Sequence, residues 1–377
     1  MSVHLPYGGS SAHRSIACPG WLKKSENIPS RPPGDAAVEG SMHHEVQEVC
    51  QRDFFVPKEC LSLVYKEPGT DIIREFTPDD LDLSEIAYHA TNALLDDLDI
   101  DQFEVEPFVQ LVIGKAGGSI DLLGTSADMK TVLILDYKFG SVRVPVENSP
   151  NLSLYAVSAR HDPATADMFL KAERVVFAII QPRAKGVVFT WECELEYLDA
   201  FERKFKDCMT LTTINPGSWC KYCPAEPFCP EKRMSIFAAN LLSADHQDEL
   251  NAAAKMVDEV ETWVKNIKGE LYRQMTRGVP VPGWKIVEKR PSTKWTDETG
   301  ARAFLKTKRI AAKSITNPAA LMTPIQVGKV LHKKGRDLDL SEFIVTASTG
   351  TTIATDDDSR EAVIVSDVQG ELKEMMK

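Results

Sequence analysis

The 377-residue sequence has no apolar run long enough to cross a membrane, and its first 15 residues lack the apolar region of a secretion signal. Eight cysteines are too few for a disulfide scaffold in a chain of this length. The formal net charge of -11 argues against a protein covered in basic surface, but it is compatible with a local basic groove. These absences predict a cytoplasmic protein with no membrane partner.

The sequence does contain the composition of a globular protein and a mixture of helix and strand patterns. Hydrophobic residues make up 43% and charged residues 26%, enough for a sizeable core and for two domains. Apolar spacing predicts helices at about 36–54 and 81–98, a strand at 103–113, a hairpin at 117–140, a short strand leading into a helix at 142–160, and strands at 174–183 and 186–195. This order predicts an α/β fold with a mixed central sheet flanked by helices.

The C-terminal part of the chain has a different character. A long helix is expected from about 242 to 277, and the lysine-rich segment after it mixes helix and strand patterns. We therefore expect two domains, residues 1–238 and residues 239–377. The second would comprise a helical linker and an additional α+β accessory region.

Two aspartates and a lysine stand at the borders of the expected hairpin. In the segment VLILDYK, Asp136 and Lys138 lie on the same face of a strand because side chains alternate with period two. Asp121, on the neighbouring strand, can meet them. Two carboxylates there would hold Mg²⁺ or Mn²⁺, and the lysine could orient or deprotonate a water molecule for attack on phosphorus. The alternative is a surface strand with solvated charges, because an isolated D-x-K motif carries no information.

Asp121 followed by Asp136-Tyr137-Lys138 resembles the signature of PD-(D/E)XK nucleases in their RecB-like form. Upstream, residues 40–44 (GSMHH) are similar to the family's G-x-x-x-H helix, whose histidine is a metal ligand. The register selects His44 as that ligand, together with Asp121 and Asp136. The resemblance covers roughly residues 10–235 and implies a restriction-endonuclease-like core.

A second flanking motif lies downstream of the hairpin. Residues 151–155 (NLSLY) are similar to the family's helix that usually reads Q-x-x-x-Y, which implies that Asn151 and Tyr155 belong to the catalytic site. Asn151 replaces the glutamine and shortens the amide side chain by one methylene. Beyond the core, the segments VPGWKIVEKR and KW are similar to phage proteins of unassigned function, which implies a protein of the host cytoplasm.

The two adjacent histidines are expected to play different parts. A neutral imidazole suits Mn²⁺ or Fe²⁺ better than Mg²⁺, so His44 as a ligand predicts strong activity with manganese. For His43 we expect a solvated position or a supporting one behind the ligands. Glu106, in the segment VEPF, is a weaker candidate for a supporting carboxylate, and the alternative for it is an exposed strand position.

Cysteines form the second group of candidate ligands. The segment WCKYCPAEPFCP contains Cys220, Cys223 and Cys229, one thiolate short of a tetrahedral site. RecB-like nucleases with an iron-sulfur cluster have a similar layout, which implies Cys18 as the fourth ligand of a [4Fe-4S] cluster that joins both ends of the domain. Zinc is the rival metal, since four thiolates suit it equally well. The others are expected to be buried or ordinary free thiols: Cys50, Cys60, Cys193 and Cys208.

DNA contact would have to come from local basic groups. The candidates are Arg183 with Lys185, residues 306–309 (KTKR) and residues 333–336 (KKGR). We expect one of these three to touch DNA, because most charge runs are solvated faces.

Together these features predict a Mg²⁺- or Mn²⁺-dependent deoxyribonuclease, expected to be an exonuclease of phage DNA replication or recombination. The alternative is a non-catalytic nucleic-acid-binding or scaffold protein that keeps the nuclease fold and the cysteine site. The C-terminal region could clamp DNA or recruit a phage single-strand-binding or annealing protein.

Overall fold

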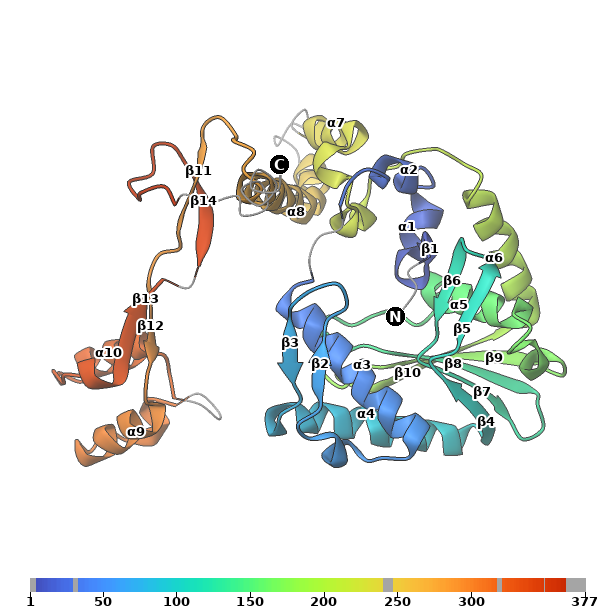
Figure 1. The fold of residues 1–377 in the computed structure, drawn as a ribbon, viewed down its shortest axis with the longest axis horizontal. Helices are drawn as coiled ribbons and strands as arrows, with labels where there is room; N and C mark the ends of the chain where they lie inside the picture. The colour runs from blue at the N-terminus through green and yellow to red at the C-terminus, as the bar shows by residue number, and fades with distance from the viewer. Residues whose placement is uncertain (1–4, 30–32, 240–246, 317–320, 349, 364–377) are drawn as a thin grey trace, which may run out of the picture. The chain divides into compact units, whose positions relative to one another are not determined.

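The computed structural model describes residues 5–29, 33–239, 247–316, 321–348 and 350–363 (Figure 1). The chain divides into two compact units, Met1–Val260 (unit 1) and Glu261–Lys377 (unit 2). The division falls inside the long helix α8 (Gln247–Thr276), C-terminal to the boundary expected after residue 238. No helix among the described residues is both long and apolar enough to cross a bilayer.

Unit 1 is built on a five-stranded mixed sheet with the strand order β10-β9-β8-β7-β4. Strand β8 (Thr131–Tyr137) pairs in parallel with β9 (Arg174–Ile180), and the other neighbours pair antiparallel. The chain passes from β8 to β9 through α5 (Pro150–His161), because a parallel pair requires a crossover. The remaining strands are β4 (Ile100–Val105), β7 (Leu122–Ser126) and β10 (Val188–Glu194).

Helices cover both faces of this sheet. Leu133 and Leu135 of β8 belong to a core shared with α4 (Pro78–Asp97), whereas Val132 and Ile134 belong to a core shared with α5 and α6 (Leu195–Cys208). Because both faces of β8 are buried, the strand is apolar on both sides up to Leu135. The expected α/β fold with a mixed sheet flanked by helices is confirmed.

Unit 1 also contains a second, smaller sheet. It has the strand order β1-β6-β5, formed by β1 (Tyr7–Gly8), β5 (Phe108–Val112) and β6 (Ala116–Ser119). The single strand expected at 103–113 is therefore wrong, since β4 and β5 belong to different sheets. Glu106 has a left-handed backbone with φ of 55°, and Pro107 has no N–H to donate, so the chain turns between them.

The short strand expected just after residue 142 is also wrong. Residues 142–146 form no strand, and the side chain of Gln181 takes the hydrogen-bonding place of a neighbouring strand. Its Nε2 donates to the carbonyl oxygens of Gly140 at 2.7 Å and Val142 at 2.8 Å, and its Oε1 accepts from Val144 N at 3.1 Å. These three backbone groups are thus hydrogen-bonded although the loop pairs with no neighbouring strand.

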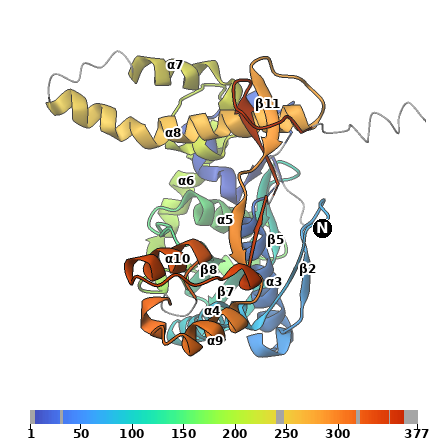
Figure 2. The ribbon, with the colours of Figure 1, turned by 90° about the vertical axis from the view of Figure 1, so that its left-hand side faces the viewer.

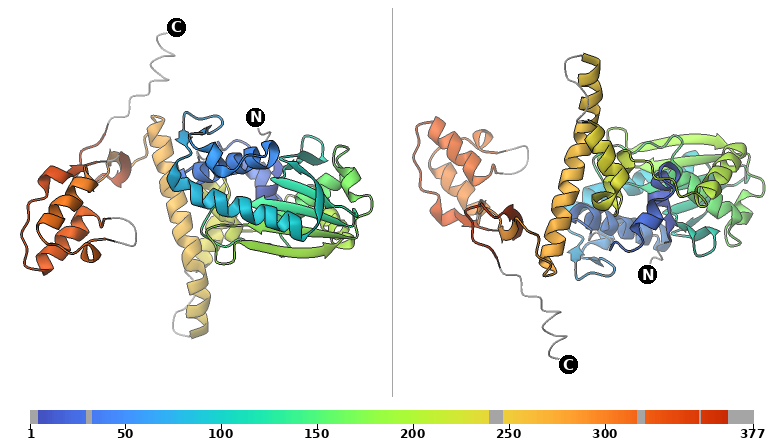
Figure 3. Two further views of the ribbon diagram at one scale, coloured as in Figure 1. Left: turned by 90° about the horizontal axis from the view of Figure 1, so that it is seen from below. Right: turned by 90° about the horizontal axis from the view of Figure 1, so that it is seen from above.

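The remaining elements of unit 1 surround this core. Helix α3 (Asp35–Asp53) lies beside α4, as Figure 3 shows in blue and cyan, and Gln47 Nε2 donates to Ser84 O at 2.9 Å between them. Lys232 of α7 (Pro230–Ala239) is almost fully buried and pairs with Glu259 of α8 at 2.6 Å. The other elements are α1 (Ala12–Ala17), α2 (Trp21–Ser25), β2 (Val64–Lys66) and β3 (Ile73–Glu75).

In its described residues, unit 2 combines the end of α8 with two antiparallel strand pairs and two further α-helices, which confirms the additional region of mixed helix and strand. Strand β11 (Trp284–Glu288) pairs with β14 (Thr351–Thr355), and β12 (Ser292–Trp295) pairs with β13 (Ile344–Ala347). Helices α9 (Glu298–Thr307) and α10 (Pro324–Lys333) share a separate hydrophobic core that includes Leu305, Val327 and Leu331.

Candidate active site

The end of β8 carries Asp136 and Lys138 on one face. Asp136 is the penultimate residue of β8, and Lys138 is the first residue after the strand. Lys138 N donates to Ile180 O of β9 at 2.9 Å, so the backbone remains paired beyond the strand end. The Lys138 ammonium forms an ion pair with Asp136 Oδ2. The period-two alternation therefore places the carboxylate and the ammonium side by side.

Asp121 stands at the start of the neighbouring strand and links the hairpin to α3. Its Oδ2 accepts a hydrogen bond from Tyr137 N at 2.5 Å, and its Oδ1 lies 3.1 Å from His44 Nδ1. His44 is contributed by α3, 77 positions earlier in the chain. The four residues of the sequence hypothesis thus form one chain of contacts, from His44 through Asp121 and the hairpin backbone to Asp136 and Lys138.

Glu106 joins this group. Ligand atoms of His44, Glu106 and Asp121 all lie within 4.8 Å of one another. The side chain is half-buried, so the exposed strand position considered as an alternative is wrong. Burial, together with the charge of Asp121, raises the pKa of Glu106 to about 8. The left-handed turn after β4 directs the Glu106 carboxyl group towards His44 and Asp121. Apolar periodicity in the sequence gives no sign of this turn.

The charged groups of the site shift one another's pKa. Burial raises the pKa of Asp136, and the neighbouring Lys138 only partly offsets it. Burial would also raise the pKa of Asp121, but the charges of His44 and Lys138 outweigh it and lower that pKa. For His44 and Lys138, burial is outweighed by Asp121 and Asp136 respectively, so both pKa values are raised. The site therefore holds buried carboxyl groups beside side chains that bind protons. A divalent cation could take the place of such protons.

Asn151 and Tyr155 lie one turn apart on α5. Asn151 Nδ2 donates to Asp136 Oδ1 at 3.3 Å, while its Oδ1 is buried without a hydrogen-bond partner among the described residues. Two glycines make room for this pair. A Cβ at Gly9 would lie 2.1 Å from Asn151 Oδ1, and one at Gly118 would lie 3.2 Å from Tyr155 Cε1. Sequence reasoning missed both glycines, whose only signal is their place in two Gly-Gly pairs.

His43 faces the protein interior. It is fully buried, so the solvated position considered for it is wrong. Its Nδ1 lies 2.8 Å from Ser84 Oγ of α4, and its ring stacks on Phe139 with centroids 4.6 Å apart. Burial lowers the pKa of His43 to about 4. Because Phe139 directly follows Lys138, this ring joins α3 to the segment that carries the lysine.

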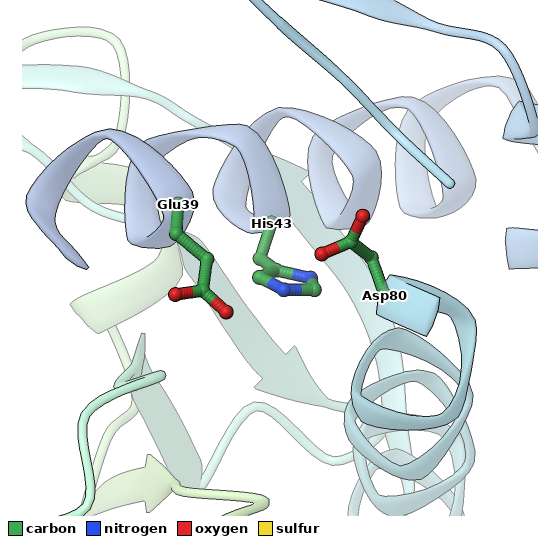
Figure 4. A group of neighbouring side chains, drawn as sticks. All are labelled: Glu39, His43 and Asp80. Atoms are coloured by element: carbon green, nitrogen blue, oxygen red, sulfur yellow. The ribbon is translucent and has the colours of Figure 1, made fainter. Parts of the chain in front are cut away.

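Glu39, His43 and Asp80 form a second group of candidate ligands within 4.8 Å of one another. Figure 4 shows the His43 ring between the two carboxyl groups. Their charges are already balanced, because Arg74 pairs with Asp80 at 2.8 Å and Arg183 pairs with Glu39 at 2.5 Å. A cation at this position would be repelled by both guanidinium groups. We therefore assign this group to the packing of α3 rather than to metal binding.

One of the three expected basic groups is used within the protein. Besides pairing with Glu39, Arg183 donates to Phe139 O at 2.6 Å. Its guanidinium thus holds the segment after Lys138 and the start of α3 together. The other two groups belong to unit 2.

The four cysteines of the sequence hypothesis line one cavity of about 20 Å³: Cys18, Cys220, Cys223 and Cys229. All four thiols are buried. The segments that carry them contact each other directly, since Gly20 N donates to Thr213 O at 2.9 Å and Asn215 N donates to Cys18 Sγ at 3.4 Å. Arg14 strengthens this contact by donating to Tyr222 O at 2.8 Å and stacking over Trp21 at 4.0 Å. The two ends of the sheet domain are thereby brought together.

Thiolate ligands suit zinc and iron alike, so these four side chains form a candidate site for either metal. The other four cysteines are buried and free, as expected: Cys50, Cys60, Cys193 and Cys208.

The fold and the site define a class of α/β protein in which carboxylates, an imidazole and a lysine meet at a mixed sheet, and in which four thiols line a separate cavity. The chain belongs to the family described as "Protein of unknown function (DUF2800)", whose model matches residues 4–361.

Two solved structures are similar to parts of the chain. The structure of SSO0001 shares 13% identity over 59% of this chain and 85% of that chain, with a TM-score of 0.27. The structure of VC1899 from Vibrio cholerae shares 11% identity over 54% of this chain and 56% of that chain, with a TM-score of 0.18. These TM-scores are too low to define a common fold.

Proposed function

We propose that this chain is a metal-dependent deoxyribonuclease of the RecB-like PD-(D/E)XK type, acting as an exonuclease in phage DNA replication or recombination. The observation that carries the proposal is the convergence of His44, Asp121, Asp136 and Lys138 from a helix and two adjacent strands. A structural ion pair would need only two of these groups. Their combination suits the hydrolysis of a phosphodiester bond.

The donor atoms fit Mg²⁺ or Mn²⁺. Asp121 and Glu106 offer carboxylate oxygens close to His44, whose nitrogen favours Mn²⁺. Asp136, which pairs with Lys138, lies outside that group and would supply a further carboxylate. Such a cation would supply Lewis-acid stabilisation of the phosphate charge and a more acidic bound water.

The side chains of the protein would supply orientation and charge. The raised pKa of Lys138 keeps its amine protonated at neutral pH, so the lysine orients a water molecule and stabilises negative charge rather than accepting a proton. Asn151 holds Asp136 from the side of α5. We expect Tyr155, one helical turn further on, to contact the DNA backbone.

The cysteine cavity would hold a [4Fe-4S] cluster, with zinc as the rival. Its part in the proposal is structural, since it joins the N-terminal segment to the end of the sheet domain and thereby supports the segment leading to α3.

The test is digestion of linear and circular duplex DNA with Mg²⁺ or Mn²⁺. We expect the wild-type protein to degrade linear DNA, and Asp136→Ala and Lys138→Ala each to reduce cleavage on the order of 1,000-fold or more. Lys130→Ala is the matched control, because Lys130 lies at the other end of β8 and pairs with Glu173 at the surface.

Wild-type-like cleavage by Lys138→Ala would contradict the proposed chemistry. DNA binding without cleavage of either substrate would favour the second candidate, a non-catalytic nucleic-acid-binding or scaffold protein. The intact set of Asp121, Asp136 and Lys138 argues against that candidate, because binding alone does not require all three.

A further inference from the structure

The ends of α9 and α10 concentrate positive charge in an otherwise acidic protein. Residues 299–336 contain nine Lys and Arg residues and no Asp or Glu, whereas the whole chain has a net charge of -11. The exposed cations at the two helix ends form what we term the basic surface: Lys306, Lys308, Arg309, Lys333, Lys334 and Arg336. Such a segregation is not expected of solvated charges scattered for solubility.

The structure joins the two basic runs in one place. Helices α9 and α10 lie next to each other (Figures 1 and 2), and Leu305 and Leu331, near their C-terminal ends, belong to the same core. Lys334 Nζ donates to Ser314 Oγ at 2.7 Å, which connects the end of α10 to the turn that follows α9. The two runs that sequence reasoning treated as separate candidates therefore belong to a single surface.

Both helices end with a residue in the left-handed conformation, and after α9 that residue is not a glycine. After α10, Gly335 takes the left-handed conformation with φ of 64°, and Arg336 N donates back to Leu331 O at 2.9 Å. After α9, Arg309 occupies the equivalent position with φ of 59°, and Ile310 N donates back to Leu305 O at 3.0 Å. Glycine is the residue that this position favours. An arginine held in a strained conformation at an exposed site suggests that its charge is used.

A helix dipole does not explain the whole surface. It favours one or two cations in the last turn of each helix. It does not account for Arg309 and Arg336, which lie beyond the helices, nor for the lack of acidic residues across the segment. Acidic residues flank this segment at Asp297, Glu298, Asp337 and Asp339, and three more follow β14 at Asp356, Asp357 and Asp358. The segment itself is therefore basic throughout, although its neighbours in the sequence are acidic.

We propose that the basic surface binds the phosphate backbone of the DNA substrate. The inference deepens the proposed nuclease function and rests on it. A lipid surface is a poorer match, because the apolar side of α10, with Pro324, Val327 and Leu331, is buried in the core of unit 2. Since the two units belong to one chain, contact through unit 2 raises the local concentration of DNA near the catalytic residues.

The test measures binding of a fluorescently labelled 30-base-pair duplex to the full chain in EDTA, where cleavage is prevented, at 50–200 mM NaCl. The surface variant carries four substitutions: Lys306→Gln, Lys308→Gln, Lys333→Gln and Arg336→Gln. The control variant carries four substitutions of exposed lysines elsewhere in unit 2: Lys265→Gln, Lys268→Gln, Lys289→Gln and Lys294→Gln. Both lose the same net charge.

We expect the surface variant to bind DNA on the order of 10- to 100-fold more weakly at 50 mM NaCl, and its slope of log affinity against log salt to fall by about 3 to 4. The control should change affinity less than about 3-fold. Equal effects in the two variants, or no effect in either, would overturn the proposal. Equally tight binding of polyglutamate by the wild type would overturn it too, since an acidic protein would then be the better partner.

Arg309→Gly separates charge from folding. Glycine suits the left-handed position, so this variant should melt at the wild-type temperature or higher and still lose DNA affinity by several-fold. Unchanged affinity would show that Arg309 does not contact DNA. It would also contradict the inference that the strained conformation serves to present its charge. The surface variant should cleave saturating DNA at the wild-type rate, whereas Lys138→Ala should bind and not cleave, so the failure of either proposal is recognised separately.

Discussion

At the scale of single residues, the adjacent histidines of α3 show how one helix serves both the site and the core. Successive side chains on a helix are about 100° apart, so His44 and His43 necessarily point in different directions. His44 approaches Asp121, whereas His43 enters the space between α3, α4 and Phe139. A one-residue shift of the helix would exchange the histidine of the candidate site for the packing one.

His44→Ala is expected to weaken Mn²⁺ binding by about 10-fold or more and Mg²⁺ binding much less, because a nitrogen ligand favours the softer ion. Calorimetric titration of both metals measures this difference directly. His89→Ala is the control, since it removes an exposed imidazole from α4. His43→Ala is unsuitable as that control because its ring is buried. A similar loss for both metals would show that His44 does not bind the cation.

At the scale of helices and strands, much of unit 1 follows from apolar periodicity, and its irregular parts do not. The alternating face of VLILDYK placed Asp136 and Lys138 together, and the helical patterns gave α3 and α4 within a few residues. The left-handed turn at Glu106 and the loop held by Gln181 depend on single side chains whose partners are far along the sequence. Periodicity carries no signal for such contacts.

The same limit applies to the candidate site. The residue types and spacing of Asp121, Asp136 and Lys138 indicate a shared position from the sequence alone. The role of Glu106, and the space that Gly9 and Gly118 leave for α5, depend on backbone geometry. The burial of His43 depends on which face of α3 meets α4, and two adjacent histidines look alike in a sequence.

The contact between α3 and α4 predicts a pH effect on stability. The pKa of His43 is lowered from 6.5 to about 4 by burial, so between these values the unfolded chain binds more protons than the folded one. The stabilising contribution of the neutral ring is therefore complete above pH 6.5 and is lost progressively as the pH falls towards 4, to a limit of about 3 kcal/mol.

Melting temperatures measured from pH 7.5 to 5 check this effect. His43→Gln removes the titrating ring and keeps a polar group that can reach Ser84, so its melting temperature should vary less with pH than that of the wild type. The carboxylates of the protein titrate in both proteins and cancel in the comparison. Parallel curves for the two proteins would contradict the assignment.

At the scale of the whole molecule, the cysteine cavity links the beginning of unit 1 to the segment that follows its sheet. Anaerobically purified protein is expected to be brown, with broad absorption near roughly 400 nm from a [4Fe-4S] cluster. Cys18→Ser should remove the colour and lower the melting temperature by about 5 °C or more, because the connection between the two ends is then open. Absorption spectra, iron content and thermal melting measure these changes.

Cys208→Ser is the matched control, since Cys208 is a buried thiol outside the cavity. It should keep the colour. A colourless wild-type protein with one equivalent of zinc would keep the structural role and refute the cluster. Protein without any bound metal after anaerobic purification would refute both.

The position of the four thiols along the chain has a consequence for biosynthesis. Cys18 precedes every strand of the five-stranded sheet in the chain, but the cavity is complete only when Cys229 has emerged from the ribosome, after all of these strands. The sheet can therefore form during translation before the four thiols meet. If the cavity takes the proposed iron-sulfur cluster, a cell short of iron would accumulate chains whose sheet is folded while their N-terminal segment still lacks its anchor.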